Sequence, residues 1–376
     1  MTNCILPSAL PAQAASADKF IAAALQPFVD SHSLAGAVAL VADKNGVLEI
    51  ESVGWGDVTA KKPMKTNDLF WIASQSKPIT VAAFMMLVDE GKVSLDDPVE
   101  KYLLEFLGQW LAVEHDDEHM LLRHTQHRIT VRNILSHTSG LPFSSAMEQP
   151  TLDALPLKTA VRSYAMAPLQ YEPESKYQYS NAGINTAGRI IEVVSGMPYE
   201  DFLQKRLFDP LNMKDTTFWP TKAQQKRLAK PYAPNEAKND IKEMTIGQLH
   251  YPLDDRAVRF PMPAGGLFST AEDCARFCRM LLNDGELDGK RYISHNAVVE
   301  MTKRQTAPGI PESYGLGLGI GGGWFGHGGA FSTNMTVDTN RGLVKVWLVQ
   351  HAGFPGNGQE AEGAFNRVVD RKWGKR

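Results

Sequence analysis

The sequence WIASQSKPITVAAFMMLV occupies residues 71–88 and carries the clearest structural signal in the chain. From Ile79 onward the segment is apolar on every face, and a helix of that kind has to be buried in the centre of a protein. Pro78 has no backbone N–H to donate to an earlier carbonyl, so it belongs in the first helical turn. The sequence therefore predicts a central, buried helix that begins at Ser74.

Ser74 and Lys77 stand three residues apart at the head of this helix, so their side chains lie on the same side of it. A serine hydroxyl is a weak nucleophile, and a lysine can take its proton if burial or nearby charge lowers the lysine pKa. The N-terminus of a helix also offers free N–H groups to a developing oxyanion. The alternative is a capping serine beside a surface lysine, because a Ser-x-x-Lys pattern alone arises by chance.

The two ends of the chain predict antiparallel strands with flanking helices. The Asn45-Gly46 pair supplies the positive φ angles that a tight hairpin turn needs. The patterns predict a helix over residues 16–28, strands over 37–42, 47–53, 314–320, 331–337 and 343–349, and a closing helix with Ala361, Phe365, Val368 and Val369 on one face.

The middle of the chain is mostly helical, and it includes an amphipathic helix over residues 184–194 that Gly196 stops. The simplest architecture brings the two ends together in one antiparallel sheet covered by helices. We therefore expect an α+β protein. Its sheet domain would be discontinuous, residues 1–70 and 262–376, and residues 71–261 would form a mostly helical domain.

Composition excludes several classes of protein. The 376 residues are 43% apolar, which is enough for a large core, and 39 basic against 42 acidic side chains give a net charge of −3. Without a long single-sign run, a nucleic-acid groove or a polybasic membrane patch has no support. No apolar stretch reaches the roughly 18 residues of a membrane span, and three cysteines cannot form a disulfide framework. Residues 5–17 are Ala-rich like the end of a signal peptide, which favours export, but no basic segment precedes them.

Three motifs follow one another along the chain: Ser74-x-x-Lys77, Tyr179-x-Asn181 and His327-Gly328-Gly329. Their order resembles the serine β-lactamase and penicillin-binding-protein superfamily, and most closely its branch of class C β-lactamases, family VIII carboxylesterases and D-aminopeptidases. Supporting segments with the same resemblance are residues 135–142, 210–216 and 263–270. The resemblance runs from Leu34 to Gly353 and implies the β-lactamase/transpeptidase-like fold.

The resemblance also implies a role for each motif residue. Ser74 would be the nucleophile that forms an acyl-enzyme, and Lys77 would accept or relay its proton. Tyr179 would protonate the leaving group and activate the hydrolytic water, and Asn181 would orient the substrate and Lys77. No metal and no cofactor are implied.

The third motif would supply the substrate-binding strand. The resemblance places the oxyanion hole at the N–H groups of Ser74 and Ala330, the latter on the edge strand after Gly328 and Gly329. Glycines have no Cβ, so a substrate could lie close against that strand. β-Lactamases usually carry a lysine where this chain has His327, and an imidazole is mostly uncharged near neutral pH.

This departure favours ester hydrolysis over β-lactam hydrolysis. We expect a serine hydrolase that acts on small-molecule esters. A β-lactamase or D-amino-acid peptidase on β-lactam or D-amino-acid peptide substrates is the first alternative. A non-catalytic, penicillin-binding-like sensing module is the second, and the oligomeric state stays open.

Residues 115–119 read HDDEH and match a zinc-peptidase spacing, with His124 and His127 nearby. On a helix this spacing would place two imidazoles on one face. The segment is polar and lies between Trp110 and Val131 as an insertion would, so a solvated, histidine-rich surface is the favoured interpretation.

Three other patterns receive structural interpretations. The glycine run from Gly315 to Gly323 precedes no helix, so a strand and a flexible turn are favoured over a nucleotide loop. His137 is interpreted as a buried histidine at the end of a helix, because the chain has no G-x-S-x-G serine elbow. Cys274 and Cys278 fall on one apolar helical stripe and are interpreted as core residues.

Overall fold

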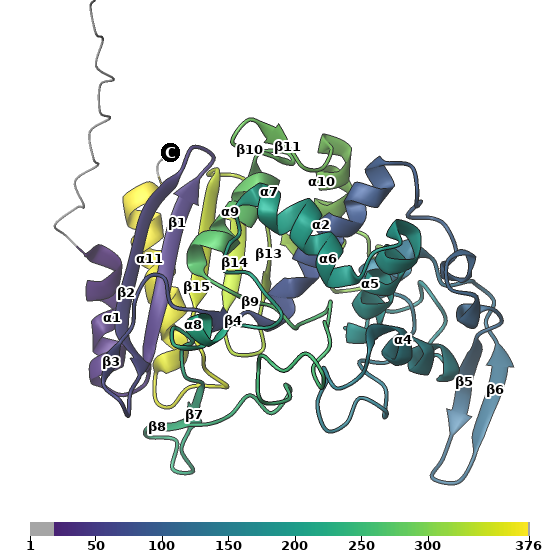
Figure 1. Cartoon of the computed structure of the whole chain (residues 1–376), viewed down its shortest axis with the longest axis horizontal. Coiled ribbons are helices and arrows are strands. Elements are labelled where there is room, and N and C mark those ends of the chain that lie inside the picture. The colour runs from purple at the N-terminus through teal and green to yellow at the C-terminus, as the bar shows by residue number, and fades with distance from the viewer. Residues whose placement is uncertain (1–18, 375–376) are drawn as a thin grey trace, which may run out of the picture.

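The computed structural model describes residues 19–374, so the Ala-rich segment 5–17 lies outside the described residues. Seven antiparallel strands form the central sheet, in the spatial order β12 (Gly319–Gly321), β13 (Trp324–Gly328), β14 (Asn334–Asp338), β15 (Leu343–Leu348), β1 (Gly36–Asp43), β2 (Val47–Asp57) and β3 (Lys62–Pro63). Val38 of β1 lies opposite Leu348 of β15. The two ends of the chain therefore meet in one sheet, as the sequence predicts (Figure 1).

Helices cover both faces of this sheet. One core contains α1 (Phe20–Asp30) and α11 (Ala361–Trp373), and the other contains α2 (Ser76–Asp89) and α9 (Ala271–Leu282) (Figure 1). Successive residues of a strand point to opposite faces. On β1, Ala37, Ala39 and Val41 belong to the first core, and Val38, Leu40 and Ala42 belong to the second.

Helix α2 is the buried central helix that the sequence predicts. Its residues from Ser76 to Leu87 are all buried, in agreement with their lack of a polar face. Pro78 is the third helical residue, where its missing N–H costs nothing. Ser74 lies in a 3₁₀ turn, η1 (Ala73–Gln75), immediately before the helix.

The middle of the chain packs helices beside α2. α5 (Asn181–Ser195) begins at Ser180, whose hydroxyl accepts the Gly183 N–H, and ends at Gly196 with a φ of 70°. The other helices are α3 (Val131–Leu135), α4 (Leu157–Met166), α6 (Tyr199–Leu203), α7 (Asp209–Leu211), α8 (Lys222–Gln225) and α10 (His295–Thr302). Two-stranded ribbons are β4 (Phe70–Trp71) with β9 (Phe268–Ser269), β5 (Trp110–His115) with β6 (Met120–His124), β7 (Tyr232–Pro234) with β8 (Ile241–Glu243), and β10 (Glu286–Leu287) with β11 (Lys290–Arg291).

Two predicted strands are wrong in their extent. The strand predicted over residues 314–320 is reduced to β12, which begins at Gly319. Gly317 has a φ of 71°, and a Cβ there would lie 2.5 Å from a Val81 methyl, so this segment turns and packs on α2 instead of pairing. The strand predicted from Phe331 begins at Asn334, because a turn precedes it.

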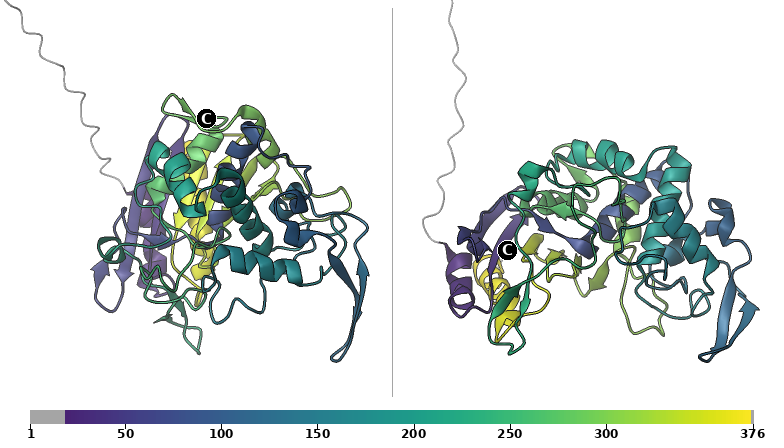
Figure 2. Two further views of the ribbon diagram at one scale, coloured as in Figure 1. Left: turned by 45° about the vertical axis from the view of Figure 1, so that its right-hand side comes forward. Right: turned by 60° about the horizontal axis from the view of Figure 1, so that its bottom comes forward.

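The zinc-peptidase alternative loses its geometric basis. Residues 115–119 form the end of the β5–β6 hairpin, which projects from the far side of the helices (Figure 2), and not a helix. The His119 side chain is 80% exposed. Among the side chains described in residues 19–374, no group of three His, Cys, Asp or Glu residues could hold a metal ion. Within the same range, no helix combines the length and apolarity needed to cross a membrane.

Two of the structural interpretations, those of His137 and of the two cysteines, are confirmed. His137 follows α3 and is fully buried. Cys274 and Cys278 are free, buried thiols of α9.

Candidate active site

The turn that carries Ser74 is built by its neighbours. Ala73 has a φ of 45°, a backbone conformation that residues with a Cβ seldom adopt. The Ser76 hydroxyl donates to the Ala73 carbonyl at 2.6 Å and accepts the Leu267 N–H at 3.2 Å, which ties the turn to the segment before β9. Ser74 is left half-buried in the turn ahead of α2, whereas the sequence predicts that the helix begins at Ser74 itself.

Lys77 is fully buried beneath Ser74. Its Nζ lies 2.8 Å from Asn181 Oδ1, 2.8 Å from the Ala264 carbonyl oxygen and 3.1 Å from Ser74 Oγ. The Asn181 and Ala264 oxygens only accept hydrogen bonds, so they take two N–H groups of Lys77. A neutral amine then has its lone pair free to face the third neighbour, the Ser74 hydroxyl.

Burial sets the protonation of both groups that flank Ser74. Burial lowers the pKa of Lys77 well below its usual range, which favours the neutral amine. Burial also raises the pKa of Tyr179, although a hydrogen bond with Ser74 acts in the opposite direction. Tyr179 therefore keeps its proton, and Lys77 Nζ lies 4.5 Å from the centre of its ring.

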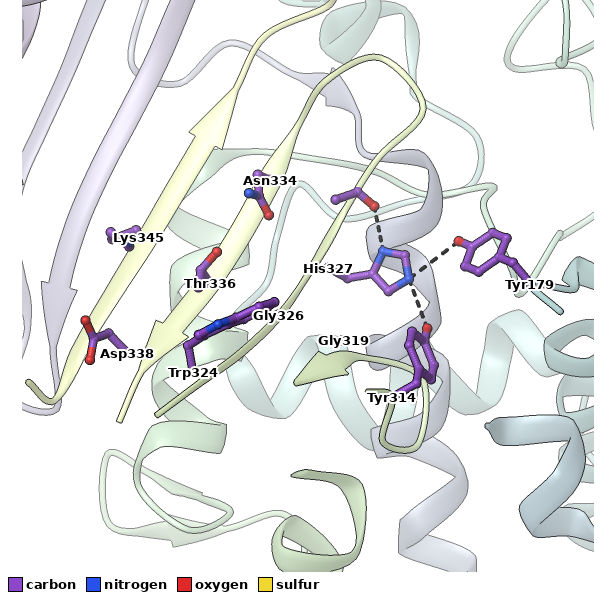
Figure 3. A pocket seen from close by; sticks show the side chains of 11 residues that line it. Tyr179, Tyr314, Gly319, Trp324, Gly326, His327, Asn334, Thr336, Asp338 and Lys345 are labelled. Carbon is purple, nitrogen blue, oxygen red and sulfur yellow. Dashed lines mark hydrogen bonds between the residues drawn. The ribbon is translucent and has the colours of Figure 1, made fainter. Parts of the chain in front are cut away.

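The sequence predicts no strand between residues 321 and 330, and this is corrected: His327 lies on a strand of its own, β13, ahead of the one predicted from Phe331. Its Nδ1 is 2.6 Å from the Gly328 carbonyl oxygen, so Nδ1 carries the ring proton (Figure 3). Its Nε2 lies 3.0 Å from Tyr314 Oη and 3.5 Å from Tyr179 Oη. Burial lowers the pKa of His327 to about 3, so the imidazole is neutral at physiological pH.

Ala330 lies in the turn between β13 and β14, and not on the edge strand, which is another correction. Gly329 donates its N–H to the Thr333 carbonyl at 2.7 Å. Within residues 19–374, the N–H groups of Ser74 and Ala330 donate to no backbone carbonyl in a loop or turn. Both are candidates for binding a ligand oxygen, as the resemblance implies.

The two glycines differ in why they lack a side chain. A Cβ on Gly329 would lie 2.2 Å from Thr333 Oγ1 and 2.6 Å from the Ile72 carbonyl oxygen. A Cβ on Gly328 would meet only the Thr333 carbonyl oxygen, at 3.5 Å. Gly329 is therefore required for packing, and Gly328 faces open space as predicted.

One cavity of about 360 Å³ brings the three motifs together. Among the described residues its lining carries no Asp, Glu, Lys or Arg side chain. It is lined by Trp71, Ala73, Ser74, Phe143, Leu152, Tyr179, Asn181, Gln248, Met262, Ala264, Gly265, His327, Gly328, Gly329 and Ala330. Of the predicted site residues, only Lys77 is absent from the lining, because it lies beneath Ser74. A second cavity, of about 540 Å³, shares Tyr179, His327 and Gly328 and extends along β13 and β14 (Figure 3).

Sequence reasoning missed two contributors to this site. The Ala264 carbonyl accepts a hydrogen bond from Lys77. The sequence points to this region only through the resemblance of residues 263–270 to the superfamily. Tyr314 contacts His327, and it was expected within a strand. No local pattern marks either contact, since each joins segments far apart in the chain.

Comparison with known proteins identifies the family. The chain matches the Beta-lactamase family over residues 21–366. Protein Rv1367c of Mycobacterium tuberculosis is 32% identical over 364 residues, which covers 88% of this chain and 89% of that protein. Esterase EstB of Burkholderia gladioli is 28% identical over 345 residues, with 84% and 81% covered. The solved structure of EstCE1, a hydrolase with promiscuous acyltransferase activity, has a TM-score of 0.77 at 23% identity, with 93% and 97% covered. The chain belongs to the beta-lactamase family, within the serine hydrolase superfamily that also includes esterases and penicillin-binding proteins.

Proposed function

We propose that this protein is a carboxylesterase-type serine hydrolase that cleaves small, neutral esters through an acyl-Ser74 intermediate. The observation that carries the proposal is the environment of Lys77. Two acceptor oxygens at 2.8 Å take its N–H groups, and Ser74 Oγ is the remaining neighbour, at 3.1 Å. A buried, neutral amine in this position is a general base for the serine hydroxyl.

In the proposed acylation, Ser74 Oγ attacks the ester carbonyl while its proton passes to Lys77. The N–H groups of Ser74 and Ala330 stabilise the oxyanion of the tetrahedral intermediate. Tyr179 donates its proton to the departing alkoxide and regains one from the Lys77 ammonium. The net result is that the serine proton leaves with the alcohol.

In deacylation the same groups act in reverse on a water molecule. The water gives one proton to the Lys77–Tyr179 pair as its oxygen attacks the acyl carbon. That proton returns to Ser74 Oγ as the acyl bond breaks, so the carboxylic acid leaves and the enzyme is restored. Asn181 holds Lys77 in place throughout, since its Oδ1 accepts one N–H of the amine.

The choice of a neutral substrate rests on the charge of the cavity. Its lining has no cationic side chain among the described residues, and His327 is neutral with Nδ1–H already donated to Gly328. A substrate carboxylate would therefore lack a charge-assisted hydrogen bond there, which typically costs about 1.5–3 kcal/mol. Trp71, Phe143 and Met262 instead offer apolar surface to an acyl or alkyl group.

A substrate panel tests the proposal. We expect p-nitrophenyl esters of short acids to have a higher kcat/KM than benzylpenicillin, cephalosporins or D-alanyl amides, and Ser74→Ala to abolish turnover of all of them. Faster hydrolysis of penicillin than of any ester would replace the esterase with a β-lactamase. Faster hydrolysis of D-alanyl amides would replace it with a D-amino-acid peptidase.

A further inference from the structure

Four polar groups beside the active site form a chain that the proposed mechanism does not use. They are the Ser180 N–H, His137, Tyr314 and His327. His137 Nδ1 lies 3.2 Å from the Ser180 backbone nitrogen, and its Nε2 lies 3.2 Å from Tyr314 Oη. Tyr314 Oη is in turn 3.0 Å from His327 Nε2 (Figure 3).

The two backbone ends fix the direction of every hydrogen bond in this chain. A backbone N–H only donates, so His137 Nδ1 accepts and its proton is on Nε2. A carbonyl only accepts, so His327 Nδ1 donates to the Gly328 carbonyl, and its Nε2 carries no proton in the neutral ring. Tyr314 therefore accepts from His137 and has one direction left for its own proton, toward His327 Nε2.

His327 Nε2, which accepts the hydrogen bond from Tyr314, has a second possible donor. Tyr179 Oη lies 3.5 Å from the same His327 Nε2. An imidazole nitrogen has a single in-plane lone pair, so it accepts one strong hydrogen bond at a time. While Tyr314 occupies it, the Tyr179 hydroxyl is left to interact with Ser74, whose hydrogen bonding lowers the Tyr179 pKa.

We propose that Tyr314 and His137 are positioning residues, which fill the acceptor nitrogen of His327 and thereby leave the Tyr179 hydroxyl directed at Ser74. Neither residue needs to touch the substrate. Both are buried, and their rings pack together with centroids 4.8 Å apart, so the chain is preformed. The kinetic consequence rests on the proposed function, whereas the hydrogen-bond directions do not.

The first test reads the directions in the wild-type protein. Nitrogen NMR of ¹⁵N-histidine-labelled protein distinguishes protonated from bare ring nitrogens, and His327→Gln assigns one set of signals by its loss. We expect His327 to carry its proton on Nδ1 and one other buried imidazole, His137, to carry its proton on Nε2. A proton on His327 Nε2 would overturn the proposal, because Tyr314 could not donate to it.

The second test removes the Tyr314 hydroxyl. In Tyr314→Phe, Tyr179 becomes the sole donor to His327 and is drawn from Ser74, so we expect kcat for a p-nitrophenyl ester to fall about tenfold with KM within about twofold. Tyr177→Phe is the matched control. Tyr177 packs in the same aromatic cluster, 5.5 Å from Tyr314 between ring centroids, and within residues 19–374 its hydroxyl makes no hydrogen bond. We expect it to keep wild-type kcat.

A double-variant cycle separates positioning from structural damage. In a His327→Leu background no acceptor competes for Tyr179, so adding Tyr314→Phe should lower kcat no further. An equal tenfold loss in both backgrounds would overturn the proposal. If Tyr314→Phe does not fold, the NMR result on the wild-type protein decides whether the proposal holds. If the protein turns over no ester at all, the proposed function fails, and the NMR result still decides the chain.

Discussion

The helix wall and the strand wall of the catalytic cavity differ in burial and in how their polar groups are paired. The helix wall, residues 74–77, has its lysine wholly buried with both amide and carbonyl acceptors in place. The strand wall, residues 327–330, ranges from half-buried to exposed and ends in a turn. The helix wall can therefore hold a protonation state that the reaction needs, while the strand wall can vary without disturbing it. We infer that the helix wall supplies the nucleophile and the base, and that the strand wall selects the substrate and adds one N–H group to the oxyanion hole.

The largest expected effect is at the helix wall. Lys77→Ala and Lys77→Arg should both lose about 10²–10⁴ in kcat/KM for an ester, because neither offers a lone pair to Ser74. Stopped-flow acylation measures the loss, and near-ultraviolet circular dichroism shows whether each variant is folded. An arginine variant that retains a substantial fraction of wild-type turnover would contradict the role of Lys77 as a base.

The next effect is at the strand wall and concerns selectivity. His327→Lys should raise kcat/KM for benzylpenicillin and cephalosporins relative to esters by roughly tenfold to a hundredfold, because it supplies about 1.5–3 kcal/mol toward a carboxylate. Ester turnover should change less. A uniform loss on all substrates would mean that the His327 side chain takes part in the chemistry and not only in selectivity.

Within the strand wall, the two glycines should respond differently. Gly329→Ala should lower the free energy of unfolding by about 1–3 kcal/mol, since its Cβ would lie 2.6 Å from the Ile72 carbonyl oxygen. Gly328→Ala should leave stability nearly unchanged. Urea denaturation measures both, and equal stabilities of the two variants would remove the distinction between a packing glycine and an open one.

The sequence predicts the helix wall better than the strand wall, and the reason is physical. The burial of α2 follows from its local apolar pattern and the end of α5 follows from Gly196, although α5 begins at Asn181, three residues before the predicted start. The turn at Ala330 and the loss of the strand before Gly319 depend on contacts with Thr333 and Val81, which no local pattern encodes.

The roles of Tyr314 and the Ala264 carbonyl were hidden for the same reason. Each contact joins residues that the fold brings together from distant segments, at separations of 13 residues for Tyr314 with His327 and 187 for Lys77 with Ala264. Motif spacing gives residue types, and the tertiary structure gives their hydrogen-bond partners and the burial that sets their protonation.

The last comparison sets His327 beside an imidazole outside both walls. His351 is fully buried, its Nε2 accepts the Ala35 N–H at 3.0 Å, and burial lowers its pKa to about 4. Between these two pKa values the imidazole is protonated in the unfolded state, where its pKa is near 6.5, and unprotonated in the folded state. Protonation therefore favours the unfolded state, and stability should rise with pH between about 4 and 6.5, by up to about 1.4 kcal/mol per pH unit.

Urea denaturation from pH 4 to pH 7 checks this slope, with His351→Gln as the comparison that isolates one imidazole. The slope of the variant should be shallower than that of the wild type in this window. Identical slopes would show that burial does not lower the pKa of His351, and would weaken the same argument for His327.

The central claim is that Ser74 is the nucleophile, activated from the helix wall. Intact-protein mass spectrometry after exposure to a fluorophosphonate tests it directly, because the reagent phosphonylates an activated serine. We expect one adduct on the folded wild type, located by peptide mapping to the segment that contains Ser74, and at least a hundredfold slower labelling of Lys77→Arg. A folded wild-type protein that forms no adduct, or an adduct on another residue, would contradict the account and favour a non-catalytic binding module or a different nucleophile.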